Sequence, residues 1–524
     1  MSVIQIQNLT FGYDAHYQTI FENVSLTLDT DWRLGLIGRN GRGKTTLARL
    51  LMGQYPYSGQ ISSGVPFDYF PFPVADSYPT ARETVKNCIA PYAQWERALD
   101  NPDDLATYGD ALECYLAHDG YEIDARIDRE ASLLDVAPRA LDRPFAALSG
   151  GEQAKLMLCA LFLRPNHFLL IDEPTNHLDL EGRRALGRYL SGKKGFLLIS
   201  HDRALLDSAV NHILSINRST IEVQKGNYTG WKQNRDRQDK QELEENAQLK
   251  REIGAMTRSA AQKSGWANNI ERGKIGSHTA DRGFVGHRAA KMMQRAKSIE
   301  RRREAAIAQK EQLLRDIEEA QPLKIHPLDY PKPVLLRAHK LCIDYGGGSL
   351  FSAQGFAIQP GARVGICGGN GSGKSSILNL LLGQSIPHTG EVTIGSGLVI
   401  SHVPQDASHL HGNLTDFANA RALDEPLFKA ILRKLDFSRT QFEKDMADFS
   451  QGQKKKVLLA ASLATRAHLY VWDEPLNFLD IPSREQIETL LLTYAPTMIF
   501  VEHDAAFFEK IATQIVYLER NTET

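Results

Sequence analysis

The chain has 524 residues, of which 42% are hydrophobic and 24% charged, and its formal net charge at pH 7 is −2. This length predicts two or more domains that each bury a core, and the composition is typical of a soluble globular protein. No apolar run approaches the ~18–20 residues that span a bilayer, and the first residues lack the apolar block of a signal peptide. The 5 cysteines are scattered without CxxC spacing, which argues against disulfides and zinc. We therefore expect a cytoplasmic protein.

In chain order, the first residues, MSVIQIQNLTFGY, alternate between apolar and polar and predict a strand. Four later motifs occur twice. GRNGRGKTT recurs 330 residues further on as GGNGSGKSS. LSGGEQ recurs as FSQGQK and FLLIDEPTNHLD as LYVWDEPLNFLD, both 301 residues further on. LLISHD recurs 302 residues further on as IFVEHD. This constant order predicts an α/β protein with a duplicated cassette, the first copy at 1–230, a linker at 231–331 and the second copy at 332–524.

The first copy is longer than the second between its first two motifs. Lys44 and Ser149 are 105 residues apart, whereas Lys374 and Ser450 are 76 residues apart, so the first copy holds about 29 more residues. We place them at about 90–132, a polar segment that favours helices, and predict an added helical arm. The alternative is a surface insertion that the fold merely tolerates.

The linker is the most basic part of the chain. Between Lys250 and Arg303 it holds fourteen Lys or Arg and four Asp or Glu, a net charge of +10. Apolar residues at near-heptad spacing predict an antiparallel coiled coil of two helices, each of ~30 residues and ~45 Å long. Five glycines from Gly265 to Gly286 predict a non-helical tip.

Such charge favours a phosphate-bearing partner, either nucleic acid or an anionic membrane. The apolar side chains at the tip suit stacking on bases or crowding of a drug pocket. The alternative is a solvated coiled coil that only spaces the two copies. The residues that we single out here are Lys263, Trp266, Arg272, Lys274, Arg282, Phe284 and Arg288.

Each copy contains the pattern GxxxxGK[ST] after an apolar strand. One such loop can be a fortuitous turn, but two with the required strand favour a loop whose backbone N–H groups bind phosphates. The lysine is expected to reach the β- and γ-phosphates, and the next hydroxyl to bind Mg²⁺. The residues concerned are Gly38, Asn40, Gly41, Gly43, Lys44, Thr45 and Thr46, and in the second copy Gly368, Asn370, Gly371, Gly373, Lys374, Ser375 and Ser376.

A pair of acidic residues ends a later apolar strand in each copy. Asp172 and Asp473 are placed to hold Mg²⁺ through water, and Glu173 and Glu474 to polarise the attacking water. The alternative is a buried structural acid pair. A histidine after the next strand is expected to contact the γ-phosphate, although alone it would more often be structural, and these two histidines are His201 and His503.

The LSGGE segment predicts a second phosphate site. Ser149, Gly150 and Gly151 open a helix, and a bare glycine backbone at a helix start binds phosphate. Because each copy already has a phosphate loop, this segment is expected to meet the nucleotide of the other copy.

Together these motifs resemble the ATP-binding cassette (ABC) domain, with its Walker A, signature, Walker B and switch histidine. Two cassettes in one chain with a charged helical linker and an arm resemble the ABC-F class. GLIGRNGRGKTT, SGGEQ, DEPTNHLDL, SHDRA, GHRAAKMM, DEPLNFLD and EHDA are similar to the Lsa type of ribosome-protection proteins.

The resemblance implies two ATP molecules sandwiched head to tail between the cassettes of one chain, so we expect a monomer. One site would combine Lys44, Thr45, Asp172, Glu173 and His201 with Ser450 and Gly452, and the other Lys374, Ser375, Asp473, Glu474 and His503 with Ser149 and Gly151. The resemblance further assigns nucleotide contacts to Glu152, Gln451 and Gln453, adenine stacking to Tyr13 and Tyr345, and nucleotide and Mg²⁺ binding to Gln405. As lone aromatics, the tyrosines would more often belong to a core.

Departures from the family pattern gather in one site. Phe72 stands where the second copy has Gln405, and Gln451 stands where the first copy has Gly150. Phe72 and Gln451 both belong to the site around Lys44, so we predict that this site binds ATP but turns it over more slowly.

The resemblance implies an ATPase that binds the ribosome, with tRNA, when ATP closes the cassettes. Its linker would then confer resistance to lincosamides, streptogramin A and pleuromutilins. One alternative is a housekeeping translation factor of the same class. Another is the twin-cassette motor of a membrane transporter, which would need no basic linker of this length.

Overall fold

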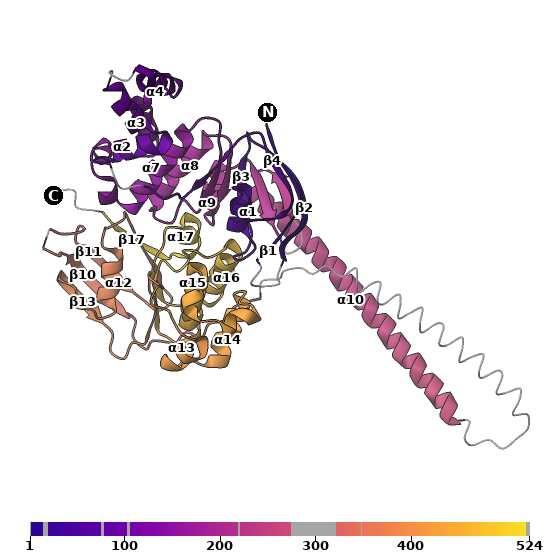
Figure 1. Cartoon of the computed structure of the whole chain (residues 1–524). Coiled ribbons are helices and arrows are strands. Elements are labelled where there is room, and N and C mark those ends of the chain that lie inside the picture. Colours follow the sequence, from indigo (N-terminus) through magenta and orange to yellow (C-terminus); the bar gives the residue numbers. More distant parts are fainter. Residues whose placement is uncertain are drawn as a thin grey trace, which may run out of the picture. The chain divides into compact units, whose positions relative to one another are not determined.

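The computed structural model describes residues 2–13, 19–74, 78–101, 105–217, 221–273, 321–346 and 348–519, with the backbone alone at 250 and 252–273. The chain forms two compact units, one made of Met1–Tyr228 with Ala320–Thr524 and the other of Thr229–Glu319. The first unit contains two α/β cassettes (Figure 1). This fold class confirms the prediction from the repeat.

In the first cassette, a six-stranded sheet has the order β5-β6-β7-β3-β8-β9 and is parallel except for β9, which runs antiparallel to β8. A three-stranded antiparallel sheet has the order β2-β1-β4. The strands are β1 (Val3–Gly12), β2 (Thr19–Asp29), β3 (Arg33–Ile37), β4 (Ser58–Ser63), β5 (Phe67–Phe70), β6 (Phe168–Asp172), β7 (Phe196–Ile199), β8 (His212–Ile216) and β9 (Ile221–Lys225).

The second cassette repeats this plan. Its parallel five-stranded sheet has the order β14-β15-β16-β12-β17, and its three-stranded antiparallel sheet has the order β11-β10-β13. The strands are β10 (Leu336–Ile343), β11 (Gln354–Ile358), β12 (Arg363–Gly368), β13 (His388–Ile394), β14 (Ile400–Val403), β15 (Leu469–Asp473), β16 (Met498–Val501) and β17 (Gln514–Leu518).

The strand sequences explain this layering. β6 and β15 are almost entirely apolar and are buried along their length, as expected for strands of a parallel sheet that is covered on both faces. β1 instead alternates between exposed and buried positions over its first residues, because only one face of its sheet packs on the core. The strand predicted at the N-terminus is therefore present.

Helices follow the strands in both cassettes. Those of the first cassette are α1 (Lys44–Leu51), α2 (Ala81–Ile89), α3 (Tyr92–Leu99), α4 (Leu105–Ala117), α5 (Ile123–Leu133), α6 (Pro138–Leu141), α7 (Gly150–Leu163), α8 (Leu180–Ser191) and α9 (Arg203–Ala209), with a 3₁₀ turn at Phe145–Ala147. Those of the second are α12 (Lys374–Leu381), α13 (Leu414–Ala420), α14 (Glu425–Lys434), α15 (Gln451–Ala464), α16 (Ile481–Tyr494) and α17 (Ala505–Ile511), with 3₁₀ turns at Arg439–Glu443 and Met446–Asp448. The segment assigned to the arm contains α3, α4 and most of α5.

The linker begins with one long helix, α10 (Tyr228–Gly273) (Figure 1). Its first part is polar on all sides and carries (i, i+4) ion pairs such as Lys232–Asp236 at 3.2 Å and Arg235–Asp239 at 2.9 Å. The expectation that helical structure stops at Gly265 is wrong, because α10 continues through this glycine to Gly273. A single glycine costs a helix only about 1 kcal/mol. The predicted returning helix lies outside the described residues.

Candidate functional site

The first phosphate loop links β3 to α1. Gly43, which precedes α1, has φ 88°, a left-handed conformation that glycine adopts without strain. The Lys44 side chain is buried, and its Nζ donates to the carbonyl oxygens of Gly38 at 2.8 Å and Arg39 at 3.1 Å. The loop is thus closed around its own lysine, with the start of α1 directly behind it.

The second loop has the same construction between β12 and α12. Gly373 has φ 87°, and Lys374 Nζ donates to the carbonyl oxygens of Gly368 at 2.9 Å and Gly369 at 2.8 Å. The hydroxyl of Ser372 is buried without a hydrogen-bond partner among the described residues. An unsatisfied buried hydroxyl in a phosphate loop suits a ligand that brings its own acceptor.

The acidic pair after β6 adjoins the first loop. Asp172 Oδ2 accepts from the hydroxyl of Thr45 at 2.8 Å and from that of Tyr69 at 2.9 Å. Glu173 Oε1 lies 3.5 Å from His201 Nε2 and has no hydrogen-bond partner among the described residues. Burial, together with Asp172, raises the pKa of Glu173 to about 7.

The acidic pair after β15 is held differently. Glu474 Oε1 lies 3.3 Å from His503 Nε2 and accepts from Gln405 Nε2 at 2.9 Å. Burial alone would raise the pKa of Glu474, but these two partners lower it below its ordinary value. These contacts favour the anionic form of Glu474, which is the form that could polarise a water molecule.

Both glutamates have a strained backbone. Glu173 has φ 47° and Glu474 has φ 46°, the left-handed region that residues with a Cβ rarely adopt. Such strain is concentrated at functional sites, where the surrounding structure keeps a side chain in an otherwise unfavourable place. The two copies share it, although their hydrogen-bond partners differ.

A buried lysine holds the Gln405 loop in the second cassette. Lys455 is 2% exposed, and its Nζ donates to the carbonyl oxygens of Pro404 at 2.8 Å, Gln405 at 2.9 Å and Asp473 at 3.3 Å. The repeat places Ala154 at the corresponding position of the first cassette. The lysine thus ties the glutamine loop to the end of β15, a link that alanine cannot make.

In the corresponding loop of the first cassette, the ring of Phe72 packs against Arg164. The guanidinium of Arg164 lies over the Phe72 ring at 5.4 Å, and Arg164 also pairs with Asp68 at 2.7 Å. No amide group therefore reaches Glu173 from the position of Phe72. Tyr69, three residues earlier, places its hydroxyl on Asp172 instead, and sequence analysis did not identify this tyrosine.

The signature segments begin α7 and α15 with capping boxes. Ser149 pairs with Glu152, and Ser450 pairs with Gln453, so these four side chains satisfy the first N–H groups of each helix. Gly452 adjoins both cassettes: a Cβ there would lie 2.5 Å from the Phe478 carbonyl of its own cassette and 2.8 Å from Asn40 Nδ2 of the other. Gly150 and Gly151 adjoin His177 of their own cassette in the same way.

Hydrogen bonds join each phosphate loop to the opposite cassette. Asn40 donates from its backbone N to Asp480 Oδ2 at 3.0 Å and from Nδ2 to the Phe478 carbonyl at 2.9 Å. Asn370 makes the same pair of bonds to Asp179 Oδ2 at 3.3 Å and the His177 carbonyl at 3.0 Å.

These bonds bring each phosphate loop against the segment that follows the acidic strand of the other cassette. The residues that receive these bonds were missed by sequence analysis. These residues could have been found from the sequence, because they lie at the end of a repeated motif, which reads NHLD in the first copy and NFLD in the second.

The two aromatic residues expected to stack on adenine lie beside the helices that follow the phosphate loops. Tyr13 is 39% exposed, with its hydroxyl 3.2 Å from Thr46 Oγ1, and Tyr345 is 57% exposed, with its hydroxyl 3.0 Å from Ser376 Oγ. Both rings are therefore too exposed to be core residues. A partly exposed aromatic ring next to a phosphate loop can stack on a base.

The residues present fit Mg²⁺ and ATP. Asp473 Oδ1 is buried without a hydrogen-bond partner among the described residues, and a water bound to a cation would satisfy it. Ser375 hydrogen-bonds to Asp473, as Thr45 does to Asp172. A hydroxyl beside a carboxylate at a phosphate loop is the oxygen set that suits this ion.

The side chains of the linker residues singled out from the sequence lie outside what the structure describes. Lys263, Trp266 and Arg272 lie on α10, within the part described by its backbone only. The others, which are Lys274, Arg282, Phe284 and Arg288, lie outside the described residues.

The ABC transporter family matches this chain twice, at residues 21–176 and 352–477, which together make up more than half of it. The chain belongs to the ABC transporter family. Its two cassettes and its similarity to the relatives below make it an ATPase of the ABC-F class, which hydrolyses ATP to ADP and phosphate. Among the described residues, every helix is too short or too polar to cross a membrane.

Two curated relatives match almost end to end. The energy-dependent translational throttle protein EttA of Haemophilus influenzae is 28% identical over 523 residues, 95% of this chain and 88% of that protein. The ribosome protection protein VmlR of Bacillus subtilis is 28% identical over 538 residues, 99% of this chain and 87% of that protein.

A solved structure of an archaeal ribosome recycling factor, aABCE1, in complex with the ribosomal stalk protein aP1, shares the fold. Its TM-score is 0.59 at 18% identity, over 98% of this chain and 88% of that chain.

Proposed function

We propose that this ABC-F ATPase acts on the ribosome, binding it when ATP closes the two cassettes and leaving after hydrolysis. The observation that carries the proposal is the end-to-end match to proteins named as a translational throttle and a ribosome protection protein. The +10 charge of the linker adds a surface of the sign that rRNA requires, and such binding weakens steeply with salt.

Each ATP site is built from both cassettes of a single chain. One site uses Lys44, Thr45, Asp172, Glu173 and His201 with Ser450 and Gly452, and the other uses Lys374, Ser375, Asp473, Glu474, His503 and Gln405 with Ser149 and Gly151. Thr45 with Asp172, and Ser375 with Asp473, would hold Mg²⁺, which when bound neutralises charge on the phosphates. The bonds from Asn40 and Asn370 across the cassette boundary support this pairing.

The two sites hydrolyse ATP at different rates. Gln405 and His503 hold Glu474 as an anionic group that faces the nucleotide, whereas Phe72 packs under Arg164 and supplies no side-chain amide to Glu173. The site around Lys374 therefore hydrolyses ATP faster, and the site around Lys44 retains ATP for longer.

The linker is the part that we propose reaches the peptidyl-transferase region, where it displaces lincosamides, streptogramin A and pleuromutilins. The similarity to VmlR, whose name states ribosome protection, supports this function. Deleting Gly265–Gly286 should abolish protection while ATPase activity survives. Full resistance in that deletion would contradict a role for the tip.

A housekeeping translation factor is the second candidate, and the similarity to the translational throttle EttA favours it. Growth on a lincosamide with and without the protein separates the two candidates, because only a protection protein raises the inhibitory concentration.

The decisive experiment traps the closed state. A Glu173→Gln/Glu474→Gln variant with ATP should sediment with ribosomes in low salt, whereas the same variant without ATP should remain in the supernatant. ATP-independent sedimentation would contradict the clamp, and the lack of any sedimentation would contradict the ribosome as partner.

A further inference from the structure

Helix α16 connects one ATP site to both ends of the linker, through the side chain of its N-cap residue and two side chains of the helix itself. It follows the NFLD motif of the second cassette and begins at the Asp480 cap. The residues at the linker ends, Tyr228 and Gln321, belong to the same compact unit as α16, so these contacts lie within a single unit.

The start of α16 contacts the phosphate loop around Lys44. Asp480, which is 1% exposed, accepts from the Asn40 backbone at 3.0 Å and is held by Lys456 Nζ at 3.2 Å. The Asn40 amide also donates to the carbonyl of Phe478 just before the helix. Any shift of this phosphate loop against the second cassette therefore acts directly on the first turn of α16.

The middle of α16 contacts the two ends of the linker. Glu485 Oε1 accepts from the hydroxyl of Tyr228, the first residue of α10, at 3.3 Å, and Tyr228 is buried. Gln486 Nε2 donates to the carbonyl of Gln321, where the described chain resumes after the linker, at 3.0 Å, and to that of Lys434 at 3.0 Å. Consecutive residues of one helix thus contact the start and the return of the linker. A helix of this length moves as a rigid element.

The equivalent helix of the first cassette lacks the required groups. The repeat aligns Glu485 and Gln486 with Arg184 and Ala185 of α8. Alanine has no polar side-chain atom, and arginine has no acceptor for a tyrosine hydroxyl. α8 does begin at an aspartate that contacts the other phosphate loop, but it cannot repeat the contacts with the linker ends.

We propose that Glu485 and Gln486 are positioning residues through which the nucleotide state of the Lys44 site sets the position of the linker. The inference rests on the proposed closure of the cassettes by ATP and is independent of the ribosome. The slowly hydrolysing Lys44 site would thus maintain the position of the linker. While ATP remains in this site, α16 keeps both linker ends in one position. Hydrolysis at the Lys374 site alone then leaves the linker in place.

The test measures two distances in the full chain with and without a non-hydrolysable ATP analogue, using site-specifically introduced labels. Labels at the exposed positions Arg139 and Glu509 report closure of the cassettes, and labels at Lys240 of α10 and Glu509 report the linker. In the wild type, the analogue should change both distances. In a Tyr228→Phe/Gln486→Leu variant, closure should persist, while the change in the linker distance should fall to about half or less.

A Thr493→Val variant is the matched control, because this α16 hydroxyl donates only to the Thr489 carbonyl of the same helix, at 2.7 Å. It should behave like the wild type. A full linker response in the double variant would overturn the proposal, and so would a double variant whose cassettes no longer close. Since no ribosome is present in this assay, failure of ribosome binding would contradict the proposed function and leave this result standing.

Discussion

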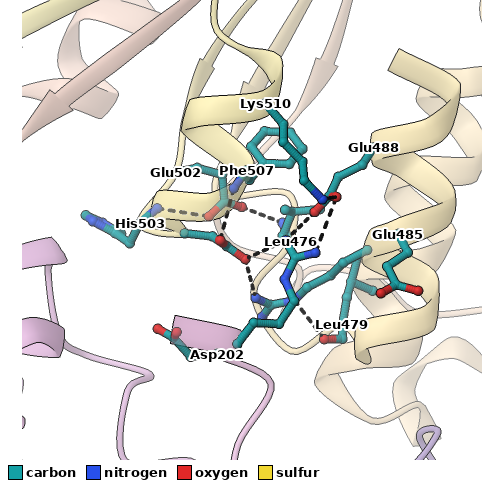
Figure 2. Close-up of polar contacts among 12 residues, drawn as sticks. Asp202, Leu476, Leu479, Glu485, Glu488, Glu502, His503, Phe507 and Lys510 are labelled. Atoms are coloured by element: carbon teal, nitrogen blue, oxygen red, sulfur yellow. Dashed lines mark hydrogen bonds and ion pairs between the residues drawn. The ribbon is translucent and has the colours of Figure 1, made fainter. Parts of the chain in front are cut away.

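Loss of the Arg203 side chain should weaken ATP-driven closure. Arg203 starts α9 of the first cassette and reaches the second, where Nη1 donates to Glu488 Oε2 at 3.3 Å, Nη2 pairs with Glu488 Oε1, and Nη2 lies 3.5 Å from Asp504 Oδ2. The arginine is 7% exposed, and the two carboxylates are 4% and 3% exposed. Lys510 lies beside Glu488 (Figure 2), and its Nζ donates to Glu488 Oε2 at 3.0 Å.

The expected magnitude follows from what remains after Arg203→Met. Truncating one partner of a buried charge pair between two surfaces costs about 2–5 kcal/mol, much of it from the charge left unpaired. Here Glu488 keeps Lys510, and Asp504 keeps Arg484 at 3.1 Å, so the low end applies. About 2 kcal/mol corresponds to a roughly thirtyfold higher ATP concentration for half-maximal closure.

The assay titrates ATP against the distance between labels on the two cassettes, with hydrolysis blocked. A Glu488→Gln variant and the double variant complete a mutant cycle, which should show coupling because the two residues are in contact. An ATP requirement within about twofold of the wild type for Arg203→Met would refute the reasoning, since the buried pair would then contribute less than about 0.5 kcal/mol to closure.

Three further predictions concern side chains of the two sites. Glu474→Gln should lower steady-state ATPase activity more than Glu173→Gln, and the opposite order would exclude the Lys374 site as the faster one. Tyr69→Phe removes one hydrogen bond to a magnesium-site carboxylate and should weaken Mg²⁺-dependent nucleotide binding by about 1 kcal/mol, roughly fivefold, in a calorimetric titration. Lys455→Met removes the donor to three carbonyls, of which the Asp473 carbonyl is buried, and should lower the free energy of unfolding by about 1–3 kcal/mol in chemical denaturation. The same change at the partly exposed Lys155, Lys155→Met, should alter it by less than about 0.5 kcal/mol.

The unequal sites have a common physical origin in the duplicated fold. Two copies of one cassette place equivalent residues in equivalent surroundings, so a difference in function must come from side chains that differ between them. Lys455 against Ala154 and Gln405 against Phe72 are such differences within the sites, and Glu485 against Arg184 is one between the helices. Each exchanges a polar group for one that cannot make the same bond.

The sequence by itself determined the α/β class, the duplication and the two phosphate loops, because local motifs such as GxxxxGK[ST] require the same backbone wherever they occur. Tertiary structure decided which groups meet across the repeat. Tyr69 and Asp172 are 103 residues apart in sequence, Asn40 and Asp480 are 440 apart, and Arg203 and Glu488 are 285 apart.

No periodicity or spacing encodes such long-range pairs, since they depend on how strands and helices far apart in sequence pack together. The length of α10 shows that local sequence signals can also mislead. Glycine content predicted a break at Gly265, but the cost of one glycine is small against the hydrogen bonds of a continuous helix.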